Sequence, residues 1–193
     1  MEFALAGVAI VIVLFLVVIY NRLVTARNTY KNALANIDVA LKQRHDMIPA
    51  LVETVKGAAA HERETLDAVI SARNAAETAR GDLGASPSPE QIKALATAEG
   101  KLNASMTQLF ALAEAYPDLR AVESFRDLQD QVARMEDKIS SSRRGYNLTV
   151  LEYNNTLEVF PNNVVAGMFS FARAQELEFD DAEQIKDMPS ISF

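Results

Sequence analysis

The chain has 193 residues, of which 49% are hydrophobic, and its formal net charge is −7. The lack of Cys excludes disulfide scaffolds, zinc fingers and thiol nucleophiles, and two His leave little for metal or acid–base chemistry. Because the acidic excess leaves no basic face to neutralise phosphates, we expect no nucleic-acid partner. The length is that of one domain, at about 150 residues per domain.

The N-terminal segment is a candidate transmembrane helix. Residues 3–20 read FALAGVAIVIVLFLVVIY, a run of 18 residues without a charge. A helix of this length spans about 27 Å, close to the roughly 30 Å hydrocarbon core of a bilayer. We favour an uncleaved anchor over a buried core helix, and over a signal peptide, because Met1 and Glu2 supply no basic n-region. The anchor residues that we single out are Phe3, Leu14, Phe15 and Tyr20.

The orientation in the membrane follows from the flanking cations. No Lys or Arg precedes the apolar run, whereas Arg22, Arg27 and Lys31 follow it. The positive-inside rule therefore places the body of the protein in the cytoplasm and the N-terminus outside. Tyr20 is expected at the membrane interface, where aromatic side chains are enriched.

The helical period continues past the membrane edge. Apolar residues recur at spacings near three and four, and Arg44 lies on the same stripe. The pattern predicts one helix that ends at about His45 and a second that runs to about Arg80. Asp46 would be the N-cap of the second helix, with Pro49 in its first turn. The alternative is a single long helix kinked at Pro49.

Two further helices follow in the sequence. Residues 81–89 hold two Gly, two Pro and two Ser, a composition typical of a loop. Ser88 caps a third helix, and Gln91 at its third position nearly completes a capping box. After a break at residues 116–118, near-heptad apolar spacing predicts a fourth helix from Leu119 to Phe160.

These elements predict an all-α protein. Apolar stripes on helices with short connections are buried against antiparallel neighbours. We therefore expect a single N-terminal transmembrane helix that continues into an antiparallel up-down four-helix bundle. Residues 1–20 would be the anchor and residues 21–160 the bundle. Residues 161–193 would form an apolar segment without a clean helical period, followed by an irregular acidic tail.

Six charged residues lie on or beside the apolar stripes. A buried charge is costly unless it is paired, so we interpret them as interhelical ion pairs that fix the register of the helices. The alternative is a polar site inside the bundle. The six residues are Arg27, Glu62, Arg73, Glu99, Glu136 and Arg143.

Templates for catalysis and metal binding do not match the sequence. A di-iron bundle needs Glu-x-x-His motifs, but Lys42 and Ala58 stand three residues before His45 and His61. Thr65 stands where a zinc-protease motif starting at His61 would need its second His. We predict no enzymatic activity, no metal and no cofactor.

Tyr-Asn pairs occur at residues 20–21, 146–147 and 153–154. The last two pairs are seven residues apart, so they share one face of a helix two turns apart. Because Asn on a packed helix face usually hydrogen-bonds a neighbouring helix, the expected role is structural.

A series of short motifs runs along nearly the whole chain. They are residues 20–24 (YNRLV) through Arg27, Asn32-Ala33, Ile37-Asp38, residues 41–49 (LKQRHDMIP), residues 51–56 (LVETVK), His61-Glu62, residues 114–119 (EAYPDL), residues 143–147 (RRGYN), Tyr153-Asn154 and the segment from Phe160-Pro161 to Phe171. In their order and spacing these motifs resemble the LemA family. The resemblance implies a helical bundle anchored in a bacterial cell membrane, here the inner membrane, and it implies no enzymatic activity. A similar layout in a relative associated with bacterial organelle membranes implies a membrane-organising role.

Two functional hypotheses remain open. The first is a scaffold that contacts the lipid bilayer and assembles laterally as a homo-oligomer, because apolar residues near the C-terminus need burial by a neighbour. The second is a membrane-tethered adaptor or signalling module that binds a protein partner through the bundle or the acidic tail. The candidate oligomer contacts are Val164, Val165, Met168, Phe169, Phe171, Ile191 and Phe193.

Overall fold

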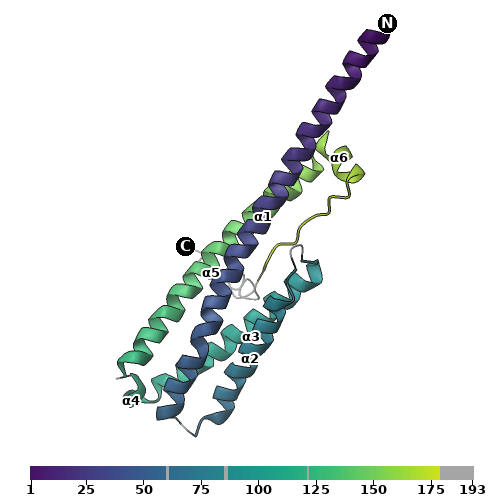
Figure 1. Ribbon diagram of the computed structural model, residues 1–193. Coiled ribbons are helices and arrows are strands. Elements are labelled where there is room, and N and C mark those ends of the chain that lie inside the picture. The colour runs from purple at the N-terminus through teal and green to yellow at the C-terminus, as the bar shows by residue number, and fades with distance from the viewer. Residues whose placement is uncertain (60, 85–86, 121, 179–193) are drawn as a thin grey trace, which may run out of the picture.

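The computed structural model describes residues 1–59, 61–84, 87–120 and 122–178. Every regular element in these ranges is a helix (Figure 1), as the sequence predicts. The acidic residues from 179 onward, with Ile191 and Phe193, lie outside the described residues. The helices are α1 (Glu2–Ala58), α2 (Arg63–Gly81), α3 (Pro89–Glu114), α4 (Pro117–Arg120), α5 (Glu123–Glu158) and α6 (Asn162–Met168).

The N-terminal helix α1 is continuous over 57 residues and contains Pro49. The predicted helix break at His45 and Asp46 is therefore wrong. The alternative prediction, that one long helix continues through Pro49, is confirmed. Apolar side chains on both sides of Pro49 are buried, among them Ile48 and Leu51, each 0% exposed. The favourable free energy of this burial offsets the cost of the one backbone hydrogen bond that a proline removes. The first helix instead ends at Ala58 and α2 begins at Arg63, and the Glu62 N–H donates to the Ala59 carbonyl between them.

The third helix begins as the sequence predicts. The Ser88 Oγ accepts a hydrogen bond from the Gln91 N–H at 3.3 Å, and the Gln91 Oε1 accepts one from the Ser88 N–H at 2.8 Å. This reciprocal pair is the complete capping box, and it supplies two backbone donors at the helix start with acceptors. Pro89 occupies the first helical position, where its missing N–H costs nothing.

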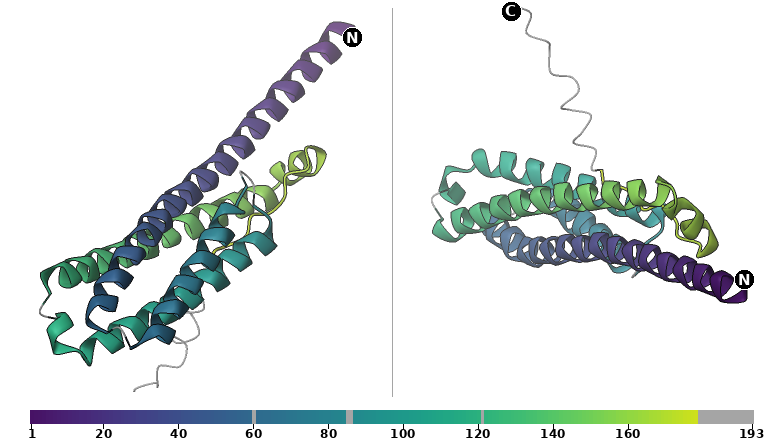
Figure 2. Two further views of the ribbon diagram at one scale, coloured as in Figure 1. Left: turned by 60° about the horizontal axis from the view of Figure 1, so that its bottom comes forward. Right: turned by 90° about the horizontal axis from the view of Figure 1, so that it is seen from above.

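The helices pack along one another in two main pairs, α1 with α5 and α2 with α3, and α1 also contacts α2. Figures 1 and 2 show α1 and α5 running in opposite directions, with the N-terminal part of α1 projecting beyond the other helices. Buried side chains form three clusters. The far cluster includes Val55, Leu109 and Phe125, the middle cluster includes Ile37 and Tyr146, and the membrane-end cluster includes Ile19, Leu23, Leu157, Val165 and Ala166.

The chain after α5 contains a helix that the sequence pattern missed. Residues 162–168 form α6, although their apolar residues show no clean helical period. The buried face of α6 consists of Asn162, Val165 and Ala166, so a helix of seven residues, with a polar residue on its buried face, presents too short an apolar stripe for a periodicity to be visible. Residues 171–178 then run without regular secondary structure back along α5 (Figure 1).

Candidate functional sites: a buried charged network, a tail ladder and an apolar collar

A charged network lies at the centre of the helices. Arg44 and His45 on α1 and Glu99 on α3 are 1%, 0% and 0% exposed. The Arg44 guanidinium donates to carboxylates of Glu99 and Glu136, and to the Asn103 Oδ1 at 2.7 Å. Because an uncompensated buried charge is strongly destabilising, these partners are what make the buried Arg44 tolerable. One side chain thus connects α1 with α3 and α5.

His45 extends the network from α3 to α2. Its Nδ1 lies 2.9 Å from a Glu77 carboxylate oxygen, and its Nε2 lies 2.9 Å from a Glu99 carboxylate oxygen. Both ring nitrogens donate to ionised carboxylates only when the imidazole carries two hydrogens. Hydrogen bonds from Arg80 and His45 lower the pKa of Glu77 to about 2, so Glu77 is an anion at neutral pH.

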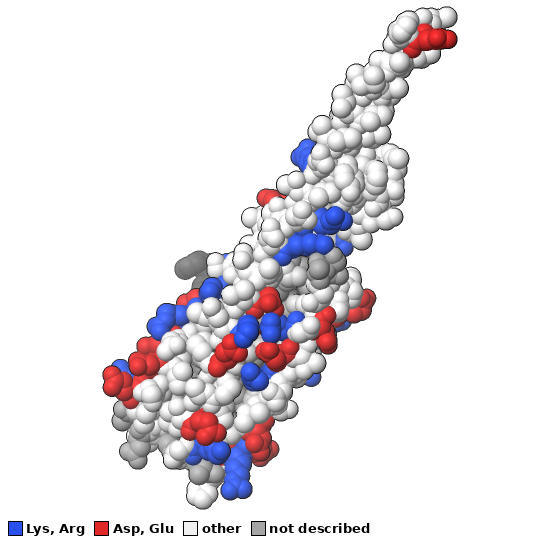
Figure 3. Space-filling model, in the orientation of Figure 1, with Lys and Arg blue, Asp and Glu red and all other residues white. Residues whose placement is uncertain are grey.

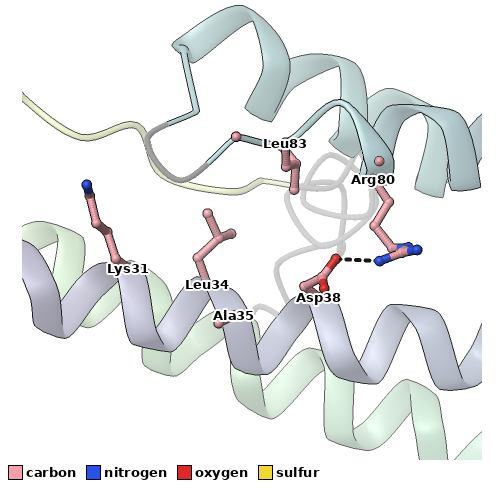
Figure 4. Close-up of a pocket in the computed structure, with 8 residues that line it drawn as sticks. Lys31, Leu34, Ala35, Asp38, Arg80 and Leu83 are labelled. Atoms are coloured by element: carbon pink, nitrogen blue, oxygen red, sulfur yellow. Dashed lines mark hydrogen bonds and ion pairs between the residues drawn. The ribbon is translucent and has the colours of Figure 1, made fainter.

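Arg80 continues the chain of charges to the surface. It donates to Glu77 on its own helix and to Asp38 on α1, each at 2.8 Å, and Figure 4 shows the bond to Asp38. The hydrogen bond with Glu77 raises the pKa of Arg80. A surface pocket of about 340 Å³ adjoins this ion pair, and Lys31 and Gly81 are among its lining residues. The network therefore runs from a buried centre to a solvated edge.

Arg73 compensates for the proline inside α1. Pro49 has no N–H, so the His45 carbonyl oxygen lacks the donor that a residue four positions later would supply. The Arg73 Nε, on α2, donates to this oxygen at 3.1 Å. A residue on one helix thus satisfies an acceptor that the neighbouring helix leaves open.

We expect Arg73→Met to lower the free energy of unfolding by about 1–3 kcal/mol, the cost of a buried acceptor left without a donor. In a Pro49→Ala background the alanine backbone N–H at this position supplies that donor, so the same Arg73 substitution is expected to cost less. A double-mutant cycle measured by chemical denaturation tests the coupling between the two positions. An equal loss in both backgrounds would show that Arg73 acts through another contact.

The structure places the six predicted network residues at different sites. Glu99 and Glu136 share Arg44, and Arg73 bonds the His45 carbonyl. At the far end of the molecule, Glu62 accepts from the Tyr116 hydroxyl at 3.0 Å. Arg27 lies over the Phe171 ring, 5.0 Å from its centre, and Arg143 is half-buried on α5.

Sequence reasoning missed the residues that join the network. Arg44 was recognisable, because it lies on the apolar stripe of its helix. His45 gave no signal, since both of its partners are on other helices, and the pairing of Glu77 with Arg80 on their own helix does not reveal that they also bond His45 and Asp38 on α1. Within the described part of the chain, no group of three His, Asp or Glu side chains converges as metal ligands would. The ion pairs of the charged network connect α1 to α2, α3 and α5.

A second polar feature, the tail ladder, consists of Tyr146, Asn147, Tyr153 and Asn154 on α5. Asn154 donates to the Ala174 carbonyl at 3.0 Å and accepts from the Ala174 N–H at 2.9 Å. Asn147 makes the same pair of bonds with Leu177, at 3.1 and 2.9 Å. The two Asn therefore bind the extended tail and not a neighbouring helix, which corrects the expectation from the sequence.

The two Tyr of the tail ladder bind the same segment. The Tyr153 and Tyr146 hydroxyls donate to the carbonyls of Ala172 and Gln175 at 2.9 and 2.7 Å. Burial raises the pKa of Tyr153 to about 12 and also raises that of Tyr146, which keeps both hydroxyls protonated as donors. All six hydrogen bonds reach main-chain atoms of the tail.

The spacing of the tail ladder follows from helix and strand geometry. Seven residues of α5 rise about 10.5 Å, and three residues of extended chain cover about 10 Å. Asn147 and Asn154 are seven residues apart, whereas their partners Leu177 and Ala174 are three apart and run in the opposite direction. The seven-residue repeat thus matches an antiparallel extended tail.

The third feature is an exposed apolar face, here called the apolar collar. It consists of side chains that follow the end of α5, lie on α6 or follow the end of α6, and these side chains are between 53% and 77% exposed. Beneath it, Val165 and Ala166 pack on Ile19 and Leu23 of α1 in the membrane-end cluster. The Phe169 ring lies 4.8 Å from the Tyr20 ring. The collar consists of Val159, Phe160, Val164, Met168 and Phe169.

The candidate oligomer contacts separate into three groups. Val165 is 1% exposed and Phe171 packs against the membrane-end cluster, so both are covered by their own chain. Val164, Met168 and Phe169 belong to the apolar collar. Ile191 and Phe193 are outside the described residues.

One helix in the described ranges is long and apolar enough to cross a membrane, and it is α1. Only 6% of its most apolar window is buried, unlike a core helix of the same composition. The four predicted anchor residues lie in this part of α1, and Phe3, Leu14 and Phe15 are exposed. Figure 3 shows this region white except for the acidic residue near its tip.

Comparison with known proteins identifies relatives. Magnetosome protein MamQ 2 of Paramagnetospirillum magneticum is 30% identical over 95 residues, which are 49% of this chain and 33% of that protein. The chain thus spans about a third of the first relatives that it matches. Protein LemA of Metamycoplasma hominis is 24% identical over 166 residues, 86% of this chain and 71% of the relative. The sequence model of the LemA family matches residues 33–193, which include the charged network, the tail ladder and the apolar collar, and the chain therefore belongs to the LemA family.

Proposed function

We propose that this chain is a non-enzymatic, single-pass membrane scaffold whose copies assemble side by side in the bilayer. The observation that carries the proposal is the continuity of α1, which runs without a break from the apolar N-terminal segment into the far cluster. An unbroken helix holds the body in a fixed orientation to its anchor. Equivalent faces of neighbouring copies then meet at the same height, which lowers the entropic cost of association.

The polar groups support a structural role more than a catalytic one. The buried carboxylates and cations of the charged network bond one another across the helices. A catalytic site needs a group that is placed to meet a substrate, and in this network the charged groups are directed at one another. The relatives named magnetosome proteins and LemA carry no enzyme name, which is in keeping with this proposal.

We expect the full-length chain to stay in the membrane pellet after an alkaline carbonate wash. We also expect the detergent-solubilised particle to be several times larger than the 21.2 kDa monomer, as measured by light scattering corrected for detergent. Removal of residues 179–193, which contain Ile191 and Phe193, should reduce the particle size if these residues contact a neighbour. A monomer at micromolar concentration would contradict assembly, and release by carbonate would contradict the anchor.

A further inference from the structure

The apolar collar belongs to a long uncharged stretch of the chain. Residues 159–172 contain no Asp, Glu, Lys or Arg, and the collar side chains among them are more than half exposed. Val165 and Ala166, on the opposite face of α6, already fill the membrane-end cluster. Burial against the chain's own core therefore explains one face of α6 and leaves the collar unexplained. Large contiguous apolar surfaces of this kind mark interaction sites.

The position of the apolar collar along α1 indicates what covers it. The Phe169 ring packs at a tilt of 58° against the ring of Tyr20, the last residue of the apolar run, and Val165 shares a cluster with Ile19. Leu16, one turn further into the run, also packs against this cluster. If α1 spans the bilayer, α6 lies beside the last turns of the apolar run and so at the boundary between acyl chains and headgroups. This is the depth at which interfacial apolar helices are seated.

Charged residues begin where the collar ends. Arg22 on α1 and Arg173 after α6 are both exposed, and they follow the two uncharged stretches directly. Arg173 also pairs with Glu158, the last residue of α5. Arginines at this level can reach lipid phosphates while apolar side chains occupy the acyl region. On α1 and again in residues 159–173, an uncharged apolar stretch is thus followed by an exposed arginine.

We propose that the apolar collar is a second membrane contact, seated in the interface of the leaflet that α1 enters. Its ligand is phospholipid: acyl chains cover Val164, Met168 and Phe169, and headgroup phosphates face Arg22 and Arg173. This contact rests on the proposed anchoring by α1. Two attachments beside each other fix the rotation of α1 about its axis, which one spanning helix alone does not. Continuity with the apolar surface of α1 favours lipid over a second copy, since a copy would have to displace lipid from this boundary.

Single cysteines labelled with an environment-sensitive fluorophore test the contact, and the native chain has no Cys to interfere. The full-length chain is reconstituted in vesicles of phosphatidylcholine and phosphatidylglycerol that contain brominated lipid. The test variant is Met168→Cys, with Val13→Cys in the apolar run as the positive control. The matched negative control is Leu148→Cys on α5, since Leu148 is 56% exposed and Met168 is 65% exposed. We expect several-fold stronger quenching at residue 168 than at residue 148. At residue 168, lipid brominated close to the headgroup should quench more than lipid brominated near the end of the acyl chain.

The outcomes separate the contact from the anchor. Strong quenching at residue 13 with no more quenching at residue 168 than at residue 148 would overturn the collar contact and leave the anchor intact. Absence of quenching at residue 13 would overturn the anchor itself. A residue 168 label that is shielded from brominated lipid and from aqueous iodide, and that crosslinks between subunits, would show that a second copy covers the collar and would likewise overturn the proposal.

Discussion

Replacement of Glu99 by Leu is expected to lower the free energy of unfolding by about 3–5 kcal/mol, the cost of breaking a buried ion pair from one side. Glu99 accepts from Arg44 with one carboxylate oxygen and lies beside the His45 Nε2 with the other. Its loss leaves a buried guanidinium with fewer acceptors and an imidazole nitrogen without a partner. Denaturant unfolding of the full-length chain in detergent micelles measures the change.

Two further variants separate charge from packing. Glu114→Leu makes the same replacement on the exposed end of α3, and its effect should stay within about 0.5 kcal/mol. Adding Arg44→Met to Glu99→Leu removes the uncompensated charge, so the double variant should lose less than the sum of the single losses. Strict additivity would show that the Arg44–Glu99 pair does not hold the helices together.

Replacement of Asn154 by Ala is expected to free the tail at Ala174. The variant loses a donor and an acceptor at once, and we expect it to cost about 1–3 kcal/mol. The amide of Ala174 should then exchange with solvent at least about tenfold faster, since a loss of 1.4 kcal/mol corresponds to a factor of ten. Hydrogen exchange followed by NMR in micelles measures this amide and that of Leu177.

The neighbouring residue provides the control for the tail ladder. Asn155 is exposed beside Asn154, so Asn155→Ala should leave the exchange of the tail amides unchanged. Asn154→Asp keeps the acceptor for the Ala174 N–H but loses the donor to its carbonyl, so its effect should be intermediate. If Asn154→Ala leaves the Ala174 amide protected, packing of Leu177 and not the tail ladder holds the segment.

Much of the helical layout could be predicted from local signals. The uncharged run at residues 3–20, the capping box at Ser88 and the apolar spacing of α5 each determine structure from nearby residues alone. Pro49 misled the prediction, because the cost of a proline inside a helix depends on contacts made elsewhere. Here Arg73, distant in sequence, satisfies the acceptor that the proline leaves open.

The sites were less predictable than the helices, since they depend on which helices become neighbours. The Tyr-Asn repeat was visible, but its partner is an extended segment without a sequence signature of its own. Glu99 and Glu136 were recognisable as charges on apolar stripes, whereas their common partner follows only from the packing of α1 against α3 and α5. Long-range pairing leaves no periodic trace in a single sequence.

The length of α1 has a mechanical consequence. About 38 residues of this helix extend past Tyr20, which at 1.5 Å per residue makes an arm of roughly 57 Å. Transmembrane helices tilt to match bilayer thickness, and a tilt of about 10° would swing the tip of such an arm by roughly 10 Å. If α1 spans the bilayer as proposed, a thinner or thicker membrane would thereby displace the distal end of the protein, and α1 would act as a lever that responds to bilayer thickness.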